Sequence, residues 1–268
     1  MIRTVFSAVL ALSLAVPALA QDEVSPEAFA TNNAYGALYH EFGHLFVDQF
    51  QLPILGNEEY VADAIATLML LGEKTDLSHA VSYDMVDGYL RMDAAFGASD
   101  MAEVDFNDEH GLDQQRASQM TCLLVGGDPD NFVDLADQMA FEPERQDACI
   151  GEYEQAARGW QRLIKDYLRG SGPEGAKLTV VYEPAGDKYA AMADLIKREK
   201  VLENVADTVT RQFVLQKPAK LKAALCDEEN AFYDPEASAV TLCYEYLQLY
   251  YDLIANPEKA GAEFAEPS

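Results

Sequence analysis

The sequence predicts an α+β fold that is mainly α-helical. Apolar residues recur at helical spacing through most of the first 169 residues, whereas β-rich runs bounded by turn residues occur only after residue 176. Two or three short strands need another surface to pack on. We therefore expect the helical half to pack on a small sheet from the C-terminal half, in one domain rather than two.

The helical half divides at residues that begin or end helices. Pro53 and Gly56 end a first helix, Asn57 can cap a second, and Gly72 can close it. A turn is expected at 126–129, whose sequence is Gly-Gly-Asp-Pro. The helices predicted in this half are 33–50, 58–71, 78–97, 114–124, 131–140 and 143–168.

The C-terminal half follows a glycine-rich stretch, 170–176, which we expect to be a linker. Its residue types predict strands at 177–183, 211–215, 221–226 and 239–244, and helices at 187–208 and 245–255. An acidic tail, 256–268, is expected to fray. The expected domain thus covers 21–268, with a helical part at 21–169 and a strand-bearing part at 177–255.

The first twenty residues have the features of a cleaved signal peptide. Arg3 gives a positive start, an apolar run covers 5–16, and Ala18-Leu19-Ala20 is a small-residue cleavage site. The run is too short to span a bilayer, and no Cys follows the cleavage site to carry a lipid. We expect an exported protein, periplasmic or secreted, without a membrane anchor.

The chain is strongly acidic, with 46 Asp and Glu residues against 19 Lys and Arg and a formal net charge of −27. Such a surface repels phosphate backbones and anionic lipids, so we expect neither nucleic acid nor anionic lipid as a partner. The sequence leaves the oligomeric state open.

Four cysteines form an even set, which in an exported protein indicates disulfides. Three pairings are possible. The local pairing, Cys122–Cys149 and Cys226–Cys243, fits the two regions of the chain and is the one we expect. Free thiols in the core are the alternative. A zinc site made of cysteines is disfavoured, because the chain has no C-x-x-C motif.

The strongest functional signal is His40-Glu41-Phe42-Gly43-His44, an H-E-x-x-H motif within a predicted helix. Residues four apart share a helix face, so both histidines can reach a single Zn²⁺. Glu41 would then stand beside the attacking water and could take its proton. The alternative is a pair of surface histidines. The apolar neighbours of the motif argue against it, because buried histidines need polar partners.

The third metal ligand is expected on the next helix. The extended motif that supplies a third histidine fails, because Val47 and Phe50 stand where Gly and His are required. Glu59 and Asp63 are four residues apart, so Glu59 could bind the metal while Asp63 orients a ligand histidine. Glu58 is expected to point about 100° away from Glu59. As an alternative, acidic residues are also common at helix N-termini without any metal.

These residues resemble a known class of zinc enzymes. Glu59 and Asp63 after H-E-x-x-H are similar to the pattern of gluzincins, the thermolysin-like zinc peptidases. The string over 40–66, HEFGHLFVDQFQLPILGNEEYVADAIA, more specifically resembles a bacterial family of metallopeptidase-like proteins known as a domain of unknown function. The resemblance continues at 108–122, 230–235 and 242–245, and covers most of the mature chain. It implies a zincin-like fold, a zinc cofactor and a peptide or protein substrate.

One feature departs from that family. There, the segment similar to 230–245 precedes H-E-x-x-H, whereas in this chain it follows. The two halves are thus exchanged in order, as in a circular permutation, with 170–175 joining the old termini. The sheet that borders a zincin cleft should then come from the C-terminal half.

Two further residues have open roles. The resemblance makes His110 a candidate to stabilise the negative charge on the carbonyl oxygen during hydrolysis. It could equally be a loop histidine bound to a neighbouring acid. Arg116 could pair with an acid near the site or with a surface Glu, which is the usual outcome.

Two functions from different classes follow from these residues. The first is a zinc-dependent metallopeptidase, with His40, His44 and Glu59 as ligands and Glu41 as general base. The alternative is a non-enzymatic exported binding protein with a structural or vestigial metal site. A structural site needs a fourth protein ligand and no base. The presence of Glu41, without an obvious fourth ligand, favours the peptidase.

Overall fold

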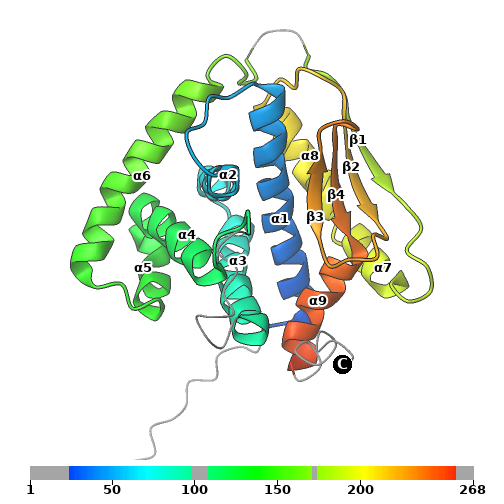
Figure 1. Ribbon diagram of the computed structural model, residues 1–268, viewed down its shortest axis with the longest axis horizontal. Coiled ribbons are helices and arrows are strands. Elements are labelled where there is room, and N and C mark those ends of the chain that lie inside the picture. The colour runs from blue at the N-terminus through cyan, green and yellow to red at the C-terminus, as the bar shows by residue number, and fades with distance from the viewer. Residues whose placement is uncertain (1–23, 98–107, 171–173, 258–268) are drawn as a thin grey trace, which may run out of the picture.

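The computed structural model describes residues 24–97, 108–170 and 174–257 (Figure 1). The expected signal peptide, part of the expected linker and the tail from residue 258 onward lie outside the described residues. The elements are, in chain order, α1 (Pro26–Gln49), α2 (Glu58–Glu73), α3 (Asp76–Phe96), α4 (Asp113–Gly127), α5 (Pro129–Gln138), α6 (Pro143–Ile164), β1 (Leu178–Tyr182), α7 (Ala190–Arg198), α8 (Val201–Gln212), β2 (Ala219–Ala224), β3 (Ala231–Asp234), β4 (Ala239–Cys243) and α9 (Tyr244–Ala255). The predicted class, α+β and mainly α with a small C-terminal sheet, is confirmed.

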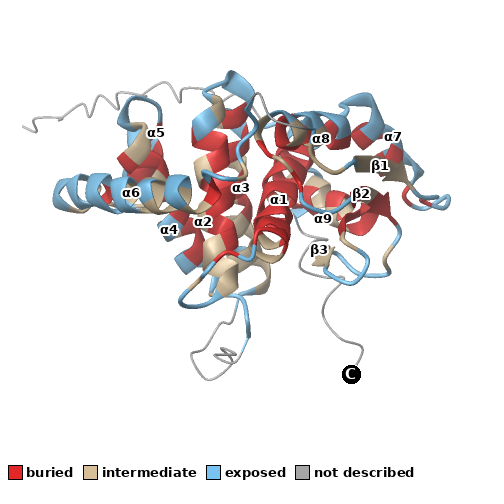
Figure 2. Ribbon diagram, turned by 90° about the horizontal axis from the view of Figure 1, so that it is seen from above, coloured by how far each residue is buried: buried red, intermediate tan, exposed pale blue. Residues whose placement is uncertain are grey.

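Helix α1 runs through the middle of the molecule, with α2 to α6 on one side and the sheet on the other (Figure 1). It is buried along most of its length, whereas α6 is largely exposed (Figure 2). The reason is visible in the sequence, because α1 carries apolar side chains on nearly all sides, and such a helix is stable only in a core. The central position of α1 brings the H-E-x-x-H residues between the two halves.

The sheet has the strand order β1-β2-β4-β3. The first three of these strands are parallel, and β3 is antiparallel to β4, with Phe232 opposite Thr241. The inner strand β4 is buried at all five positions, whereas β3 is half-buried at the edge. Both β3 and β4 contact α1, so an edge strand of the sheet lies beside the central helix.

Several predicted boundaries are wrong for local reasons. Helix α1 starts seven residues earlier than expected, because Ser25 caps it and Pro26 occupies its first turn. The single helix expected at 187–208 is two, α7 and α8, separated at Lys200, whose φ of 53° is left-handed. No glycine or proline marks that break.

The strand expected at 211–215 is also wrong. Its first two residues finish α8, and Phe213 forms only an isolated bridge with Leu168. Conversely, β3 was not among the predicted strands, since it has only four residues. A tight turn joins it to β4, in which the Asp234 carboxylate accepts hydrogen bonds from two backbone N–H groups at 2.9 Å.

The cysteines pair locally, as expected. One disulfide, Cys122–Cys149, joins α4 to α6, and the other, Cys226–Cys243, joins the loop before β3 to the end of β4. The second bond therefore anchors the segment that leads into the edge strand.

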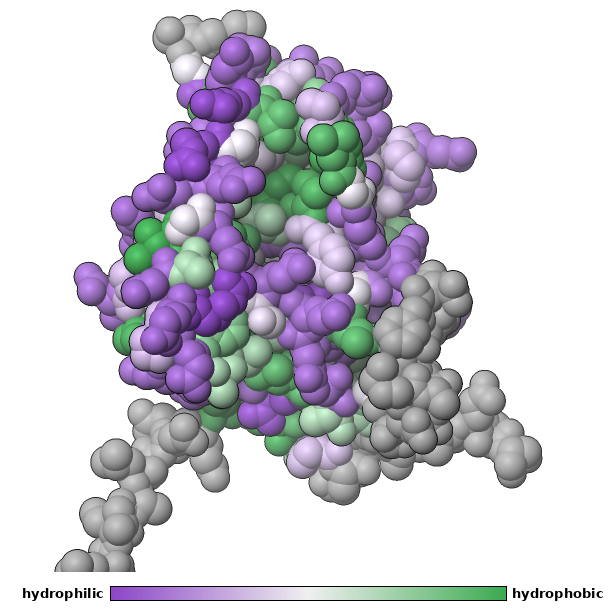
Figure 3. All heavy atoms as spheres, turned by 60° about the vertical axis from the view of Figure 1, so that its left-hand side comes forward, coloured by the Kyte–Doolittle hydropathy of each residue, from purple (hydrophilic) through white to green (hydrophobic). Residues whose placement is uncertain are grey.

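The surface agrees with the composition. The face in Figure 3 is mostly hydrophilic, with apolar side chains gathered in a hollow near its top. Within the described ranges, no helix is both long and apolar enough to cross a bilayer.

The two ends of the described chain lie side by side. Phe29 and Ala30 of α1 form a small apolar cluster with Leu249, Tyr250 and Leu253 of α9. The rings of Phe29 and Tyr250 are 6.1 Å apart. The first turns of α1 are therefore packed against the last turns of α9.

Candidate metal centre

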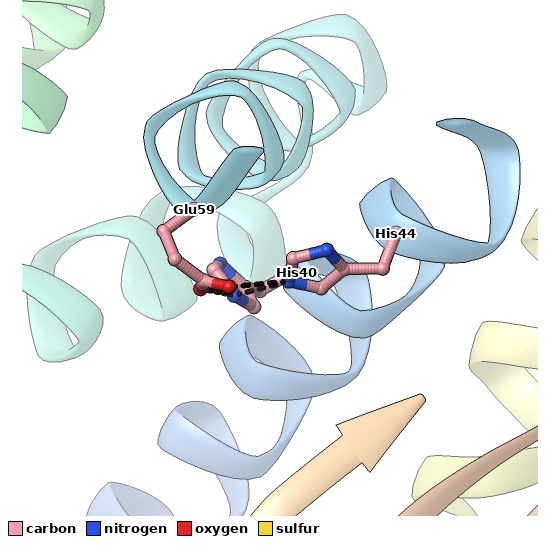
Figure 4. A group of neighbouring side chains, drawn as sticks. All are labelled: His40, His44 and Glu59. Carbon is pink, nitrogen blue, oxygen red and sulfur yellow. Dashed lines mark hydrogen bonds and ion pairs between the residues drawn. The ribbon is translucent and has the colours of Figure 1, made fainter. Parts of the chain in front are cut away.

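Helices α1 and α2 bring the candidate ligands together. His40 and His44 project from one face of α1 toward Glu59, which lies in the first turn of α2 (Figure 4). The two helices approach closely where Gly43 meets Ala62, since a Cβ added at Gly43 would lie 2.8 Å from the Ala62 Cα. Small residues at this crossing thus bring Glu59 within reach of both imidazoles.

The donor atoms of these three residues have the spacing of a metal site. His40 Nε2 lies 3.1 Å from His44 Nε2 and 3.1 Å from a Glu59 oxygen, and His44 Nε2 lies 3.4 Å from the other Glu59 oxygen. Ligand atoms placed tetrahedrally at 2.0–2.1 Å from one ion would be roughly 3.4 Å apart. All three separations approach that value, so His40, His44 and Glu59 fit a single metal ion.

The far nitrogens of both histidines are held by carboxylates. His40 Nδ1 lies 2.8 Å from Asp63 and His44 Nδ1 lies 2.9 Å from Glu58. Such bonds fix the ring orientation and leave Nε2 free to face an ion. Asp63 contacts His40 as the sequence analysis expected. Glu58 does not point away from the site as expected, because its flexible side chain reaches back to His44.

Asp63 is itself held by a buried cation. Arg116 donates two hydrogen bonds of 2.8 Å to the Asp63 carboxylate, and its guanidinium stacks on the ring of Tyr89. Burial alone would raise the pKa of Asp63, but the bonds from Arg116 and His40 outweigh it and lower the pKa to about 2. Of the two roles left open for Arg116, the structure shows the one at the site.

Glu41 differs from the other acids in having no hydrogen-bonding or ionic partner among the described residues. Only 7% of the residue is exposed, yet Glu41 lines the pocket beside the two histidines. Burial raises the pKa of Glu41 to about 7, although the neighbouring histidines partly oppose the shift. A buried carboxylate with this pKa, facing a cavity, can accept a proton near neutral pH.

The histidines and Glu59 form one coupled ionic group in the absence of metal. Burial opposes the charged form of His40, but hydrogen bonds to Asp63 and Glu59 raise its pKa to about 9. Burial likewise opposes the charge on Glu59, but contacts with His110, His40 and His44 lower its pKa far below the usual range. The acidic surroundings thus favour a positive charge at the place where an ion would sit.

The site opens into a pocket of about 350 Å³ between the helices and the edge of the sheet. The metal-site residues form one wall, and β3 with its preceding residue Asn230 forms the opposite one. Tyr233 of β3 donates a hydrogen bond of 2.7 Å to Asp48, which lies one turn after His44. This contact connects the edge strand to the metal-bearing helix across the pocket.

Comparison with known families agrees with this geometry. A family model described as "Putative metallopeptidase" matches residues 13–164 and 182–267. The chain belongs to this family. No curated protein and no solved structure matches it.

The family match covers every residue of the candidate site. The two matched segments contain both histidines, the four acids around them and the whole β2–β4 region, and they leave out 165–181. The expected linker lies in that gap. The family resemblance seen in the sequence is therefore confirmed for the metallopeptidase family as a whole.

His110, singled out by the family resemblance, lies at the rim of the pocket. Its Nε2 is 3.1 Å from a Glu59 oxygen, and its Nδ1 is 3.3 Å from Asp108. The contact with Glu59 raises the pKa of His110, against the effect of burial. The loop is positioned by Asn57, which donates to the Glu109 carbonyl, and by close packing of Tyr60 on Gly111.

Some residues that line this pocket have no role predicted from the sequence. Asp48, Glu109 and Tyr233 line it, although the sequence marks them only as parts of the family-like segments and predicts no role for them. Asp48 could have been found, because it is four residues after His44 and so shares its helix face. Nothing local marks Glu109.

Proposed function

We propose that this protein is an exported zinc-dependent metallopeptidase. The observation that carries the proposal is Glu41, a buried carboxylate without a partner that faces a pocket beside three converging metal donors. A buried carboxylate without a partner costs stability, so its presence beside the metal donors favours a functional role. The family membership supports the same reaction class.

His40, His44 and Glu59 would hold the zinc ion. Two imidazole nitrogens and one carboxylate form a donor set that suits catalytic zinc. Bound zinc would polarise the substrate carbonyl and lower the pKa of a water molecule, which would make that water a nucleophile at neutral pH. Asp63 and Glu58 keep the imidazoles turned so that each Nε2 faces the ion.

Glu41 acts as the general base. It takes a proton from the attacking water and then passes that proton to the leaving amine. Its pKa of about 7 suits both steps, because the carboxylate and the acid forms are both populated near neutral pH. His110, at the pocket rim, is our candidate to stabilise the negative charge on the carbonyl oxygen.

The edge strand β3 offers a place for the peptide backbone. Cys243 N donates a hydrogen bond of 3.0 Å to the Asn230 carbonyl. Because hydrogen-bonded residues alternate along an antiparallel pair, Asn230 and Phe232 direct their backbone groups toward β4. The backbone groups of Ala231 and Tyr233 face away from β4. No described residue makes a backbone hydrogen bond to that side of β3. An extended peptide could add there as a further strand.

The alternative is a non-enzymatic protein with a closed, structural metal site. His110 is the residue that could close it, since its Nε2 lies 3.1 Å from Glu59. The tighter donor group contains His40, His44 and Glu59 without His110. We therefore favour an open position, as a catalytic site requires.

We further propose the gluzincin type and the exchanged order of the two halves. Glu59 and Asp63 lie on α2, immediately after the H-E-x-x-H helix, as in the gluzincin pattern. The gap in the family match at 165–181 coincides with the proposed junction. The signal-peptide-like sequence of the first twenty residues and the two disulfides support export to the periplasm or beyond.

The decisive experiment combines metal analysis with a peptidase assay. The purified protein should contain about one zinc per chain and should hydrolyse a mixed peptide library. Glu41→Gln should keep the zinc, because Glu41 is not a ligand, and should lose hydrolysis by about a hundredfold or more. Zinc binding without hydrolysis of any peptide would instead favour the structural site, and absence of stoichiometric zinc would refute both.

A further inference from the structure

We propose that the pocket selects peptides that carry Lys or Arg next to the cleaved bond. This inference rests on the proposed peptidase function and adds a substrate class to it. The residues that line the pocket fall within three segments, 40–63, 108–116 and 227–236.

Charge is unevenly distributed between these segments and the rest of the chain. Together they carry thirteen Asp or Glu residues and one Lys or Arg, whereas the rest of the chain carries 33 and 18. The rest of the chain thus has fewer than two acidic residues for each basic one, so the acidity found elsewhere in the protein does not account for the excess in these segments. The segments that contribute to the pocket are therefore selectively depleted of cationic side chains.

The one cation of these segments is already neutralised. Arg116 is buried and donates two hydrogen bonds to Asp63, so its charge is compensated within the protein. Among the described residues that line the pocket, none is a Lys or Arg. Acidic residues line the pocket from three places around the metal site, namely Asp48 on α1, Glu58 on α2 and Glu109 in the loop before α4.

Acids also flank the edge strand along which a peptide would lie. Asp227, Glu228 and Glu229 precede it, Asp234 is its last residue, and Glu236 follows it. A peptide added to β3 would thus pass carboxylates at both ends and on the opposite wall. In a partly buried cleft such charges attract cationic ligands and repel anionic ones.

An independent feature shows that this acidic region is shaped for a ligand. Glu41 is buried without a partner and faces the same pocket. The unpaired edge of β3 matches a polypeptide backbone rather than a small cation. Together these features identify the ligand as a basic peptide.

The test compares three peptides that differ only in carrying Lys, Gln or Glu at two positions. Their affinities are measured by fluorescence anisotropy with the zinc-loaded Glu41→Gln protein, which binds without cleaving. The Lys peptide should bind at least about tenfold more tightly than the Glu peptide at about 50 mM salt, and the difference should shrink near 500 mM.

Two charge-matched variants locate the effect. Asp48→Asn with Glu109→Gln should reduce the preference for the Lys peptide by about threefold or more. Asp130→Asn with Glu144→Gln removes the same charge from exposed positions on α5 and α6 and should leave the preference unchanged. Equal binding of the three peptides, or an equal loss in both variants, would overturn the inference.

Hydrolysis of the same peptides by the unmodified protein separates this inference from the proposed function. Cleavage of all three at equal rates would keep the peptidase and refute the selectivity. If the binding preference holds and no peptide is cleaved, the cleft selects basic peptides but the peptidase proposal fails.

Discussion

Gly43 of α1 packs against Ala62 of α2 so closely that a Cβ on Gly43 would lie 2.8 Å from the Ala62 Cα and 3.2 Å from its carbonyl oxygen. Both obstructing atoms belong to the backbone, so a side chain at Gly43 could be accommodated only by moving a helix. The position between the metal-binding histidines of H-E-x-x-H therefore controls the distance from α1 to Glu59.

Gly43→Ala should separate the two helices and weaken metal binding by about tenfold or more, because Glu59 would no longer reach both imidazoles. Unfolding free energy should fall by about 1–3 kcal/mol through overpacking. Calorimetric zinc titration and thermal unfolding would measure both effects. Gly159→Ala is the matched control, since a Cβ there meets no atom within 4 Å and should be neutral or slightly stabilising. Unchanged zinc affinity in Gly43→Ala would refute this role.

The adjacent acids Glu58 and Glu59 should differ sharply when neutralised. Glu59→Ala should lose stoichiometric zinc, since two histidines alone hold the ion poorly. Glu58→Gln should retain zinc with an affinity lower by about tenfold, because it only orients His44. Metal content after dialysis and competition with a chelator would decide this. Zinc lost from the Glu58 variant but kept by the Glu59 variant would reverse the assignment.

Arg116 should matter far more than a surface arginine. Arg116→Gln leaves the Asp63 carboxylate buried without its cation, so the unfolding free energy should fall by about 3 kcal/mol. Zinc affinity should fall too, as Asp63 orients His40. The control is Arg158→Gln, whose exposed pair with Glu154 should contribute less than about 1 kcal/mol. Equal denaturation midpoints for the two variants would contradict the prediction.

Metal uptake should release protons at neutral pH. His40 has a pKa of about 9 in the metal-free protein, so at pH 7 it carries a proton that must leave before Nε2 can bind an ion. Zinc affinity should therefore rise with pH up to about 9 and fall below it, by up to about tenfold per pH unit for each proton released. Calorimetry in buffers of different ionisation enthalpy would count these protons. A buffer-independent enthalpy at pH 7 would show that none is released.

The parts of the site that the sequence predicted depend on contacts within one helix. His40 and His44, or Glu59 and Asp63, are four residues apart, and helix geometry alone puts each pair on one face. The mainly helical class followed from the same periodicity. The direction predicted for Glu58 is wrong because helix geometry fixes only the direction of the Cα–Cβ bond, whereas the long side chain reaches His44 through rotations that the sequence does not specify.

The remaining features depend on tertiary contacts. Arg116 is 53 residues from Asp63, and Tyr233 is 185 residues from Asp48, so no local pattern connects either pair. Strand β3 is too short to be recognised by alternation, and it exists because β4 and the turn at Asp234 support it. The break between α7 and α8 at Lys200 contains no glycine or proline from which it could be predicted.

The packing of Phe29 against Tyr250 bears on the proposed exchange of the two halves. The first turns of α1 and the last turns of α9 share one apolar cluster, while the glycine-rich stretch at 170–176 lies between the two halves. A gene cut at that stretch and rejoined between α9 and α1 would encode the same elements in another order, with every contact around Glu41 preserved. The cleft could therefore form with either half first in the chain, since its contacts do not depend on the order of the two halves.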